Sequence, residues 1–125
     1  MSGYNTCLLV DDNYIDNFVT RKVLESSGFA HNIIVQQSPW DAIDSLRDGL
    51  VKPDVIFVDV RMPTMDGFEF LEKFEELAIE KDNIKIFMLS SSLDPTDIRR
   101  SFGNKHVTQF LHKPITKQVL EELTP

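Results

Sequence analysis

The sequence has little of what several protein classes require. It carries one cysteine, Cys7, so an internal disulfide is excluded and a reducing compartment is indicated. No apolar stretch approaches the ~18 residues that span a bilayer, and residues 1–10 lack the basic segment of a signal peptide. Lys and Arg number 13 against 20 Asp and Glu, a formal net charge of −7. We therefore expect a cytoplasmic protein without membrane insertion and without direct nucleic-acid contact, which needs clustered basic side chains.

The composition is that of an ordinary globular protein. The chain has 125 residues, of which 42% are hydrophobic and 26% charged. This length is typical of one domain and is enough to bury about two-thirds of the unfolded surface. No repeat, low-complexity segment or linker divides the sequence. We therefore expect residues 1–125 to form a single domain.

Short apolar runs alternate along the chain with helical patterns. Five runs are too short for helices and end at turn residues, which is typical of strands. The run 55–58 reads as a strand covered on both faces. Apolar residues recur at helical spacing after each run. This alternation predicts an α/β fold, a flavodoxin-like, doubly wound parallel sheet with strand order 2-1-3-4-5 and five helices. The runs are residues 6–10, 33–37, 55–58, 84–89 and 107–111.

Each helix is expected to turn its apolar stripe toward the sheet. In the first helix that stripe is Ile15, Phe18, Val19 and Val23, and Gly28 supplies a left-handed stop. The third helix has the clearest stripe, and the fourth has only two apolar anchors. These residues are Phe70, Leu71, Phe74, Leu77 and Ala78 in the third helix, and Ile98 and Phe102 in the fourth.

Polar residues stand where four of the predicted strands end. Asp11 and Asp12 follow the first strand, Asp59 the third, Ser90 the fourth and Lys113 the fifth. In the expected strand order the first and third strands are neighbours, so the three aspartates should meet at one edge of the sheet. Close carboxylates need raised pKa values or a cation between them. Hard oxygen ligands favour Mg²⁺.

This set of residues matches the needs of phosphoryl transfer. A carboxylate beside Mg²⁺ can attack phosphorus and form an acyl phosphate. Lys113 supplies a positive charge, and Ser90 offers a hydroxyl to a phosphoryl oxygen. Singly, each residue has an ordinary alternative, since Asp59 could cap a loop, Ser90 a strand, and Lys113 could be a plain loop residue. Together they indicate phosphoryl transfer, which depends on positioning and charge neutralisation.

On these motifs the sequence resembles the receiver domain of two-component response regulators, over essentially the whole chain. The matching segments are Leu-Leu-Val-Asp11-Asp12, the stretch from Asp59 to Gly67, Ser90, and Phe-Leu-His-Lys113-Pro114. The resemblance implies that Asp59 accepts a phosphoryl group from the phosphohistidine of a sensor histidine kinase or of a phosphotransfer protein. It also implies a signalling module that catalyses only its own phosphorylation and dephosphorylation.

The resemblance further implies a metal site. Mg²⁺ would bind to the side chains of Asp12 and Asp59, to the backbone carbonyl of Arg61, and through water to Asp11. Lys113 would pair with the phosphoryl group.

The resemblance also implies a switch. The peptide bond between Lys113 and Pro114 would be cis. Phosphorylation would draw the hydroxyl of Ser90 toward the phosphate and turn Phe110 inward. The surface of the fourth helix, fifth strand and fifth helix would then change its protein partners. Phe110 stands where tyrosine is common in the family, so its ring lacks the hydroxyl that would report the switch by hydrogen bonding.

Alternative functions remain open at this point. An aspartate-dependent phosphohydrolase also uses Mg²⁺ and a carboxylate nucleophile at a strand end. Enzymes of the haloacid-dehalogenase type place a second Asp two residues after the nucleophile, where this chain has Arg61. A degenerate receiver that acts only as a scaffold is disfavoured by the intact set of site residues. The chain is expected to be a stand-alone receiver or a piece of a longer regulator, and its downstream protein target is unknown.

Overall fold

A computed structural model describes residues 3–123 and contains five strands and five helices that alternate along the chain. Residues 1–2 and 124–125 of the expected domain lie outside the described part. The strands are β1 (Tyr4–Val10), β2 (Ala30–Gln36), β3 (Val55–Asp59), β4 (Lys85–Ser90) and β5 (Val107–His112). The helices are α1 (Tyr14–Ser27), α2 (Pro39–Arg47), α3 (Gly67–Glu76), α4 (Pro95–Phe102) and α5 (Lys117–Leu123).

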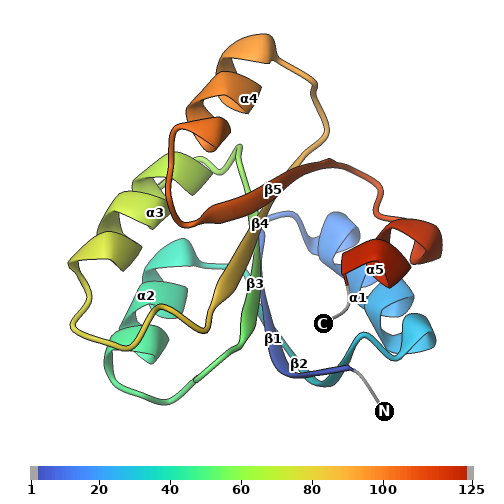
Figure 1. The fold of residues 1–125 in the computed structure, drawn as a ribbon, viewed down its shortest axis with the longest axis horizontal. Coiled ribbons are helices and arrows are strands. Elements are labelled where there is room, and N and C mark those ends of the chain that lie inside the picture. The colour runs from blue at the N-terminus through green and yellow to red at the C-terminus, as the bar shows by residue number, and fades with distance from the viewer. Residues whose placement is uncertain (1–2, 124–125) are drawn as a thin grey trace.

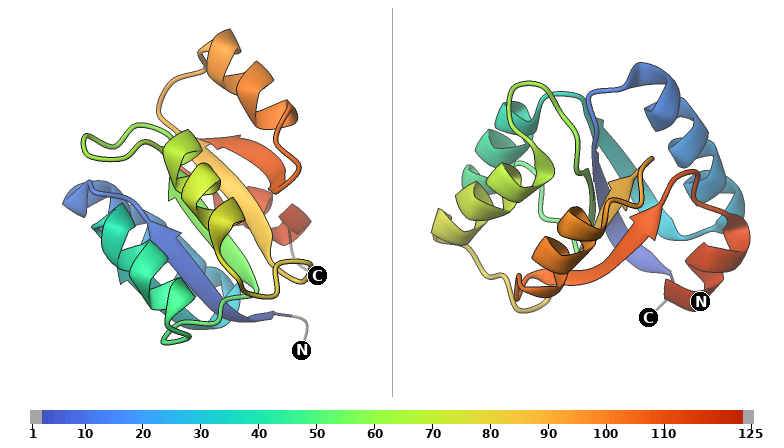
Figure 2. Two further views of the ribbon diagram at one scale, coloured as in Figure 1. Left: turned by 90° about the vertical axis from the view of Figure 1, so that its left-hand side faces the viewer. Right: turned by 90° about the horizontal axis from the view of Figure 1, so that it is seen from above.

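The strands form one parallel sheet in the order β2-β1-β3-β4-β5, which confirms the predicted flavodoxin-like topology. Helices cover both faces of this sheet (Figure 1, Figure 2). One face carries α1 and α5, the other carries α2 and α3, and α4 packs beside β5. Among the described residues, no helix has both the length and the apolar character that crossing a membrane requires.

The core consists of two apolar clusters, one on each side of the sheet. Successive side chains of a strand point to opposite faces. Along β1, Cys7 and Leu9 therefore join the cluster under α1 and α5, whereas Leu8 and Val10 join the cluster under α2 and α3. Burial of Cys7 raises the pKa of its thiol, which keeps this cysteine protonated and unreactive.

The predicted core face of α1 is wrong for three of its four residues, and Val23 alone of the four is partly buried against the cluster under α1 and α5. Ile15, Phe18 and Val19 are 68%, 58% and 43% exposed. The buried stripe lies two positions further along the helix, which is about 200° around its axis. Polar side chains can be buried on this side because they find hydrogen-bond partners at the edge of the sheet. Nδ2 of Asn17 donates to the backbone carbonyl of Asp11 at 2.7 Å. The buried residues of α1 are Asn17, Thr20 and Leu24.

The predicted stripe of α3 is largely confirmed. Phe70, Leu71 and Phe74 are buried, and Leu77 is buried at the C-terminal end of the helix. Ala78 is exposed, because the helix ends before it. Asp66 begins α3 with a capping box, a reciprocal pair of hydrogen bonds with Glu69 that fixes the start of the helix.

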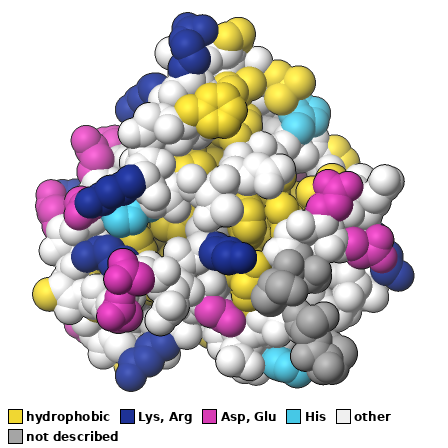
Figure 3. Space-filling model, viewed as in Figure 1, with side chains coloured by type: hydrophobic (Ala, Val, Ile, Leu, Met, Phe, Trp, Pro, Cys, Tyr) yellow, Lys and Arg dark blue, Asp and Glu magenta, His cyan; other side chains and the backbone are white. Residues whose placement is uncertain are grey.

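The predicted anchors of α4 are wrong in a similar way to those of α1. Phe102 is 80% exposed, and Ile98 is only half-buried. Instead Asp97 and Ser101 are buried, so this helix turns polar groups inward. The guanidinium of Arg100 lies 4.1 Å from the ring centre of Phe68. Because α4 turns these polar groups inward, hydrophobic side chains lie at the surface over this helix, at the top of the view in Figure 3.

Candidate functional site

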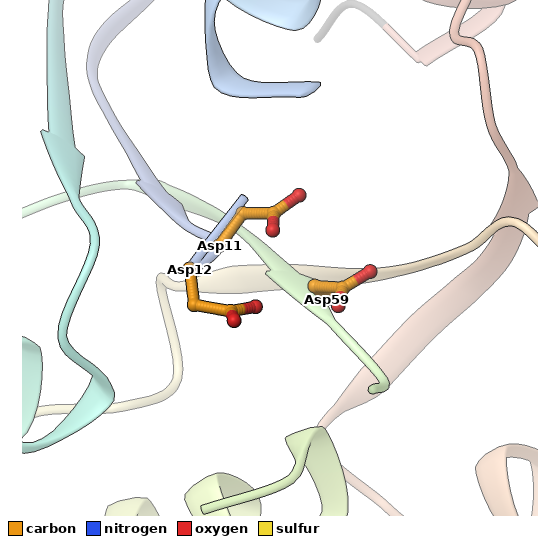
Figure 4. Close-up of side chains that lie close together, drawn as sticks. All are labelled: Asp11, Asp12 and Asp59. Atoms are coloured by element: carbon orange, nitrogen blue, oxygen red, sulfur yellow. The ribbon is translucent and has the colours of Figure 1, made fainter. Parts of the chain in front are cut away.

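Three carboxylates meet at the C-terminal edge of the sheet. Asp11 and Asp12 directly follow β1, and Asp59 is the last residue of β3, the strand beside it. One carboxylate oxygen from each of Asp11, Asp12 and Asp59 lies within 4.8 Å of the others. The three side chains extend into the same space (Figure 4). The predicted meeting of these aspartates is confirmed.

The start of α1 fixes Asp11, the first residue of the acidic pair. The backbone N–H of Asn13 donates to Oδ1 of Asp11 at 2.9 Å, and Asn17 holds the Asp11 carbonyl. Asp11 is fully buried, whereas Asp12 is exposed at the mouth of the site. One carboxylate is thus built into the fold, and its neighbour remains open to solvent.

Asp59 is held by the close approach of α3 to the end of β3. The backbone N–H of Gly67 donates to the carbonyl of Val60 at 2.9 Å. A Cβ atom at position 67 would lie 2.6 Å from the carbonyl oxygen of Asp59 and 2.9 Å from the side chain of Met88. Only glycine fits this position, so the Asp66-Gly67 pair is a requirement of the site as well as a turn signal.

Lys113 lies at the centre of the charged groups. Its Nζ is 2.6 Å from Oδ2 of Asp11, 2.8 Å from Oδ2 of Asp16 and 2.9 Å from Oδ1 of Asp59. Its backbone N–H donates to the carbonyl of Ser90 at 2.8 Å. The peptide bond to Pro114 is cis, as expected.

Burial and charge shift the protonation of these groups. Burial raises the pKa of Asp59 to about 6, with Asp11 and Asp12 acting in the same direction and Lys113 opposing them. Burial likewise raises the pKa of Asp11, against hydrogen bonds from Lys113 and Asn13. For Lys113 burial alone would lower the pKa, but hydrogen bonds to its three carboxylate partners raise it above the ordinary value. The lysine is therefore charged at neutral pH.

Ser90 and Phe110, the two residues of the expected switch, lie on the neighbouring strands β4 and β5. Ser90 is fully buried at the end of β4, in register with His112, and its Oγ accepts the backbone N–H of Ser92 at 3.0 Å. Phe110 lies on β5, opposite Met88 of β4. Its ring is half-buried against the cluster under α2 and α3.

Arg61 lies two residues after Asp59, but its side chain contacts α4 and its N-cap residue instead of the aspartate cluster. Its guanidinium contacts the carboxylate of Asp97 on α4 and lies 3.6 Å from Oδ2 of Asp94. The expected role of its backbone carbonyl as a metal ligand stays a prediction.

The donor set of the aspartate cluster fits a hard divalent cation. Its three ligand groups are all carboxylates, without the sulfur or imidazole that zinc prefers. The raised pKa of Asp59 shows that proximity and burial disfavour its ionised form, and a cation would relieve this. The mouth of the site at Asp12 is exposed, which suits an ion that keeps several waters.

Sequence reasoning missed three residues of this region. Asp16 binds Lys113, Asn17 supports Asp11, and Asp97 binds Arg61. A usable signal existed for the first two, because both lie in the turn that directly follows the acidic pair. A helix that begins at this edge of the sheet places the residues of its first turn beside the site.

Comparison with known proteins decides the family. The profile of the response regulator receiver domain matches residues 7–124. This chain belongs to the response regulator receiver domain family. The receiver domain is 30% identical to a probable methanogenesis regulatory protein, FilR2 of Methanothrix harundinacea, over 93% of this chain and 79% of that protein. Two other relatives, both named histidine kinases, are much longer, and the chain spans 14% and 9% of them.

Solved structures agree with this assignment. A two-component response regulator from Cytophaga hutchinsonii superimposes on the receiver domain with a TM-score of 0.88 at 28% identity, covering 97% of this chain and 94% of that one. A response regulator receiver protein from Dyadobacter fermentans gives a TM-score of 0.84 at 38% identity, covering 94% and 93%. The chain is therefore a receiver domain of two-component signalling, with the fold predicted from its sequence.

Proposed function

We propose that this receiver domain accepts a phosphoryl group on Asp59, from the phosphohistidine of a sensor histidine kinase or a phosphotransfer protein, in a Mg²⁺-dependent reaction. The observation that carries the proposal is the position of Asp59. Its carboxylate lies 2.9 Å from Nζ of Lys113 and within 4.8 Å of the carboxylates of Asp11 and Asp12. Asp11 also contacts Lys113, at 2.6 Å, but it is fully buried and its other oxygen accepts the N–H of Asn13, whereas the side chain of Asp59 keeps 7% exposure.

The transfer itself breaks one bond to phosphorus and forms another. An oxygen of the Asp59 carboxylate attacks phosphorus, and the bond from phosphorus to the histidine nitrogen breaks. That nitrogen keeps the electron pair, and the imidazole ring takes up a proton from solvent. The ammonium of Lys113 donates hydrogen bonds to phosphoryl oxygens as charge shifts between them.

The metal and its ligands complete the site. Mg²⁺ held by Asp12, Asp59 and the backbone carbonyl of Arg61, and through water by Asp11, would neutralise the negative charge that the phosphoryl group brings. Asp11 is positioned for this by the N–H of Asn13, which fixes one of its oxygens. A carboxylate with a pKa of about 6 is largely ionised at neutral pH and can act as nucleophile.

Phosphorylation would then alter the surface formed by α4, β5 and α5. Ser90 is buried at the end of β4, next to the Lys113 backbone, and we expect its hydroxyl to move toward a phosphoryl group on Asp59. Phe110 is half-buried and would turn inward. The surface of α4 exposes Phe102 and is held by polar contacts, which cost less to rearrange than a packed apolar stripe. A downstream protein that binds this surface would read the phosphorylation state.

The position of Arg61 argues against the phosphohydrolase alternative. In that class the residue two positions after the nucleophile is an acid/base carboxylate, but here a guanidinium occupies the position and contacts Asp97 on α4. We propose that the domain catalyses only its own phosphorylation and dephosphorylation.

The direct test is incubation with acetyl phosphate and Mg²⁺, followed by intact-mass measurement. We expect the addition of one phosphoryl group. When the metal is chelated beforehand, we expect no addition. Continuous release of phosphate from unrelated phosphate esters, without a labelled protein, would contradict the proposal.

A further inference from the structure

Asp16 is a carboxylate of the site that the proposed metal set does not use. It lies in the first turn of α1, where its backbone N–H donates to Oδ1 of the helix-capping Asn13 at 2.9 Å. Its side chain reaches Nζ of Lys113 at 2.8 Å. The cluster of possible metal ligands consists of Asp11, Asp12 and Asp59 and does not include it. The contact of Asp16 with the site therefore passes through Lys113.

Lys113 has no hydrogen-bond donor to spare in this structure. A lysine ammonium carries three N–H groups, and three carboxylates lie within 2.9 Å of Nζ, from Asp11, Asp16 and Asp59. The side chain of Lys113 is only 10% exposed. A phosphoryl oxygen can bind this ammonium well only by replacing one of its present partners.

Asp11 and Asp16 are the two partners that keep their carboxylate charge once Asp59 carries a phosphoryl group, and Asp16 is released at the lower cost. Its side chain is 38% exposed, against 0% for Asp11 and 7% for Asp59. It also borders, with Lys113 and Pro114, an open groove of about 290 Å³. A carboxylate beside solvent regains its hydration when it loses an ion-pair partner, whereas a buried one does not.

We propose that Asp16 is a positioning residue, which holds Lys113 in the resting state and competes with the phosphoryl group for its third N–H. The inference rests on the proposed function of Asp59. Asp16 lowers the affinity of the site for phosphoryl groups in two ways, by occupying a donor of Lys113 and by adding negative charge near a dianionic ligand. Its removal therefore strengthens phosphoryl binding, the opposite of what damage to the site would do.

The test measures binding of beryllofluoride, a mimic of a phosphoryl group on a carboxylate, by calorimetry at saturating Mg²⁺. Asp16→Asn removes the charge with little change of shape, and we expect about three- to tenfold tighter binding, the size of one partly exposed ion pair. Asp16→Glu keeps the charge and is expected to stay within about twofold of the parent. Asp41→Asn is the matched control, because Asp41 occupies the same position after the capping Ser38 of α2 and is exposed.

A second titration, with Mg²⁺ alone, separates this role from a structural one. Asp16→Asn should not tighten Mg²⁺ binding, since the residue is outside the metal set. Beryllofluoride affinity that is unchanged from Asp41→Asn, or weaker, would overturn the proposal. If Asp16→Asn does not fold, Asp16→Ser carries the same expectations. A parent protein that binds no beryllofluoride and takes no phosphoryl group would instead overturn the proposed function itself.

Discussion

The guanidinium of Arg61, two residues after the proposed phosphoacceptor, contacts the buried carboxylate of Asp97 on α4. This pair joins the loop after β3 to α4. Replacing Arg61 by Met keeps an unbranched side chain of similar reach to the aliphatic part of arginine and leaves a buried carboxylate without its cation. We expect the free energy of unfolding, measured in urea, to fall by about 1–2 kcal/mol.

Two controls define that effect. Arg21→Met removes an exposed pair with Glu25 and should cost at most about 0.5 kcal/mol. In a double-mutant cycle, Asp97→Asn should remove most of the cost of Arg61→Met, because the buried charge is then absent. Equal costs for Arg61→Met and Arg21→Met would show that the contact with α4 contributes nothing.

Lys113 is expected to be needed for the chemistry. Lys113→Met removes the charge 2.9 Å from Asp59, so the initial rate of labelling by acetyl phosphate should fall at least about tenfold. The pKa of Asp59, which Lys113 holds down, should rise above about 6, as followed by NMR titration of its carboxyl carbon. Lys117→Met, an exposed lysine at the start of α5, serves as the control. A labelling rate that is the same for both variants would remove Lys113 from the mechanism.

The raised pKa of Asp59 predicts that this residue destabilises the metal-free fold. The ordinary pKa of this carboxyl group is 3.8, and in the fold it is about 6, so the folded state holds the proton more tightly. The contribution of protonated Asp59 to the free energy of unfolding is fully present below about pH 4, and it is lost as the pH rises through about 6. Asp59→Asn should therefore raise the free energy of unfolding by about 2 kcal/mol at pH 7.5 without metal.

The same measurement at lower pH checks the sign. The gain from Asp59→Asn should shrink as the pH falls below about 6 and vanish near pH 4. Added Mg²⁺ should stabilise the parent and not the variant. A gain that grows toward acid pH would contradict the electrostatic account of the site.

Asp12 is predicted to act on metal binding with little effect on the fold. It is exposed at the mouth of the site, unlike the buried Asp11. Asp12→Asn should weaken Mg²⁺ binding, measured by calorimetry, by about tenfold or more, with unfolding free energy changed by less than about 0.5 kcal/mol. Asp44→Asn, on an exposed position of α2, should leave Mg²⁺ binding unchanged. Unaltered affinity in Asp12→Asn would mean that the cation binds elsewhere.

The orientation of α1 predicts which of its apolar residues support the fold. Ile15→Ser, at a side chain that is 68% exposed, should change the free energy of unfolding by less than about 0.5 kcal/mol. Leu24→Ala, at a fully buried side chain, should cost about 2–4 kcal/mol. The reverse order in urea denaturation would place the sequence-predicted stripe, not the observed one, against the sheet.

The sheet and the strand-end residues were predictable because their signals are local. Buried strands appear as unbroken apolar runs, and the parallel topology brings their ends together, so Asp11 and Asp59 could be placed side by side without a structure. The packed face of α1 was not predictable from apolar spacing. It is set by Asn17, which bonds the Asp11 carbonyl only once the helix lies on the sheet.

Contacts between distant segments were equally inaccessible. Asp16 and Lys113 are 97 positions apart, and nothing in the first turn of α1 indicates which cation its carboxylate will meet. The same holds for Arg61 and Asp97, which are 36 positions apart. Both pairs depend on side-chain directions at the sheet edge, which strand order alone does not determine.

The central claim is that Asp59 receives the phosphoryl group. The most direct measurement is to label the protein with acetyl phosphate and Mg²⁺, trap the acyl phosphate by borohydride reduction, and locate the reduced residue by peptide mass spectrometry. We predict modification at position 59 alone, with none in Asp59→Asn. Reduction at Asp11 or Asp12 of the parent, or undiminished labelling of Asp59→Asn, would contradict the account.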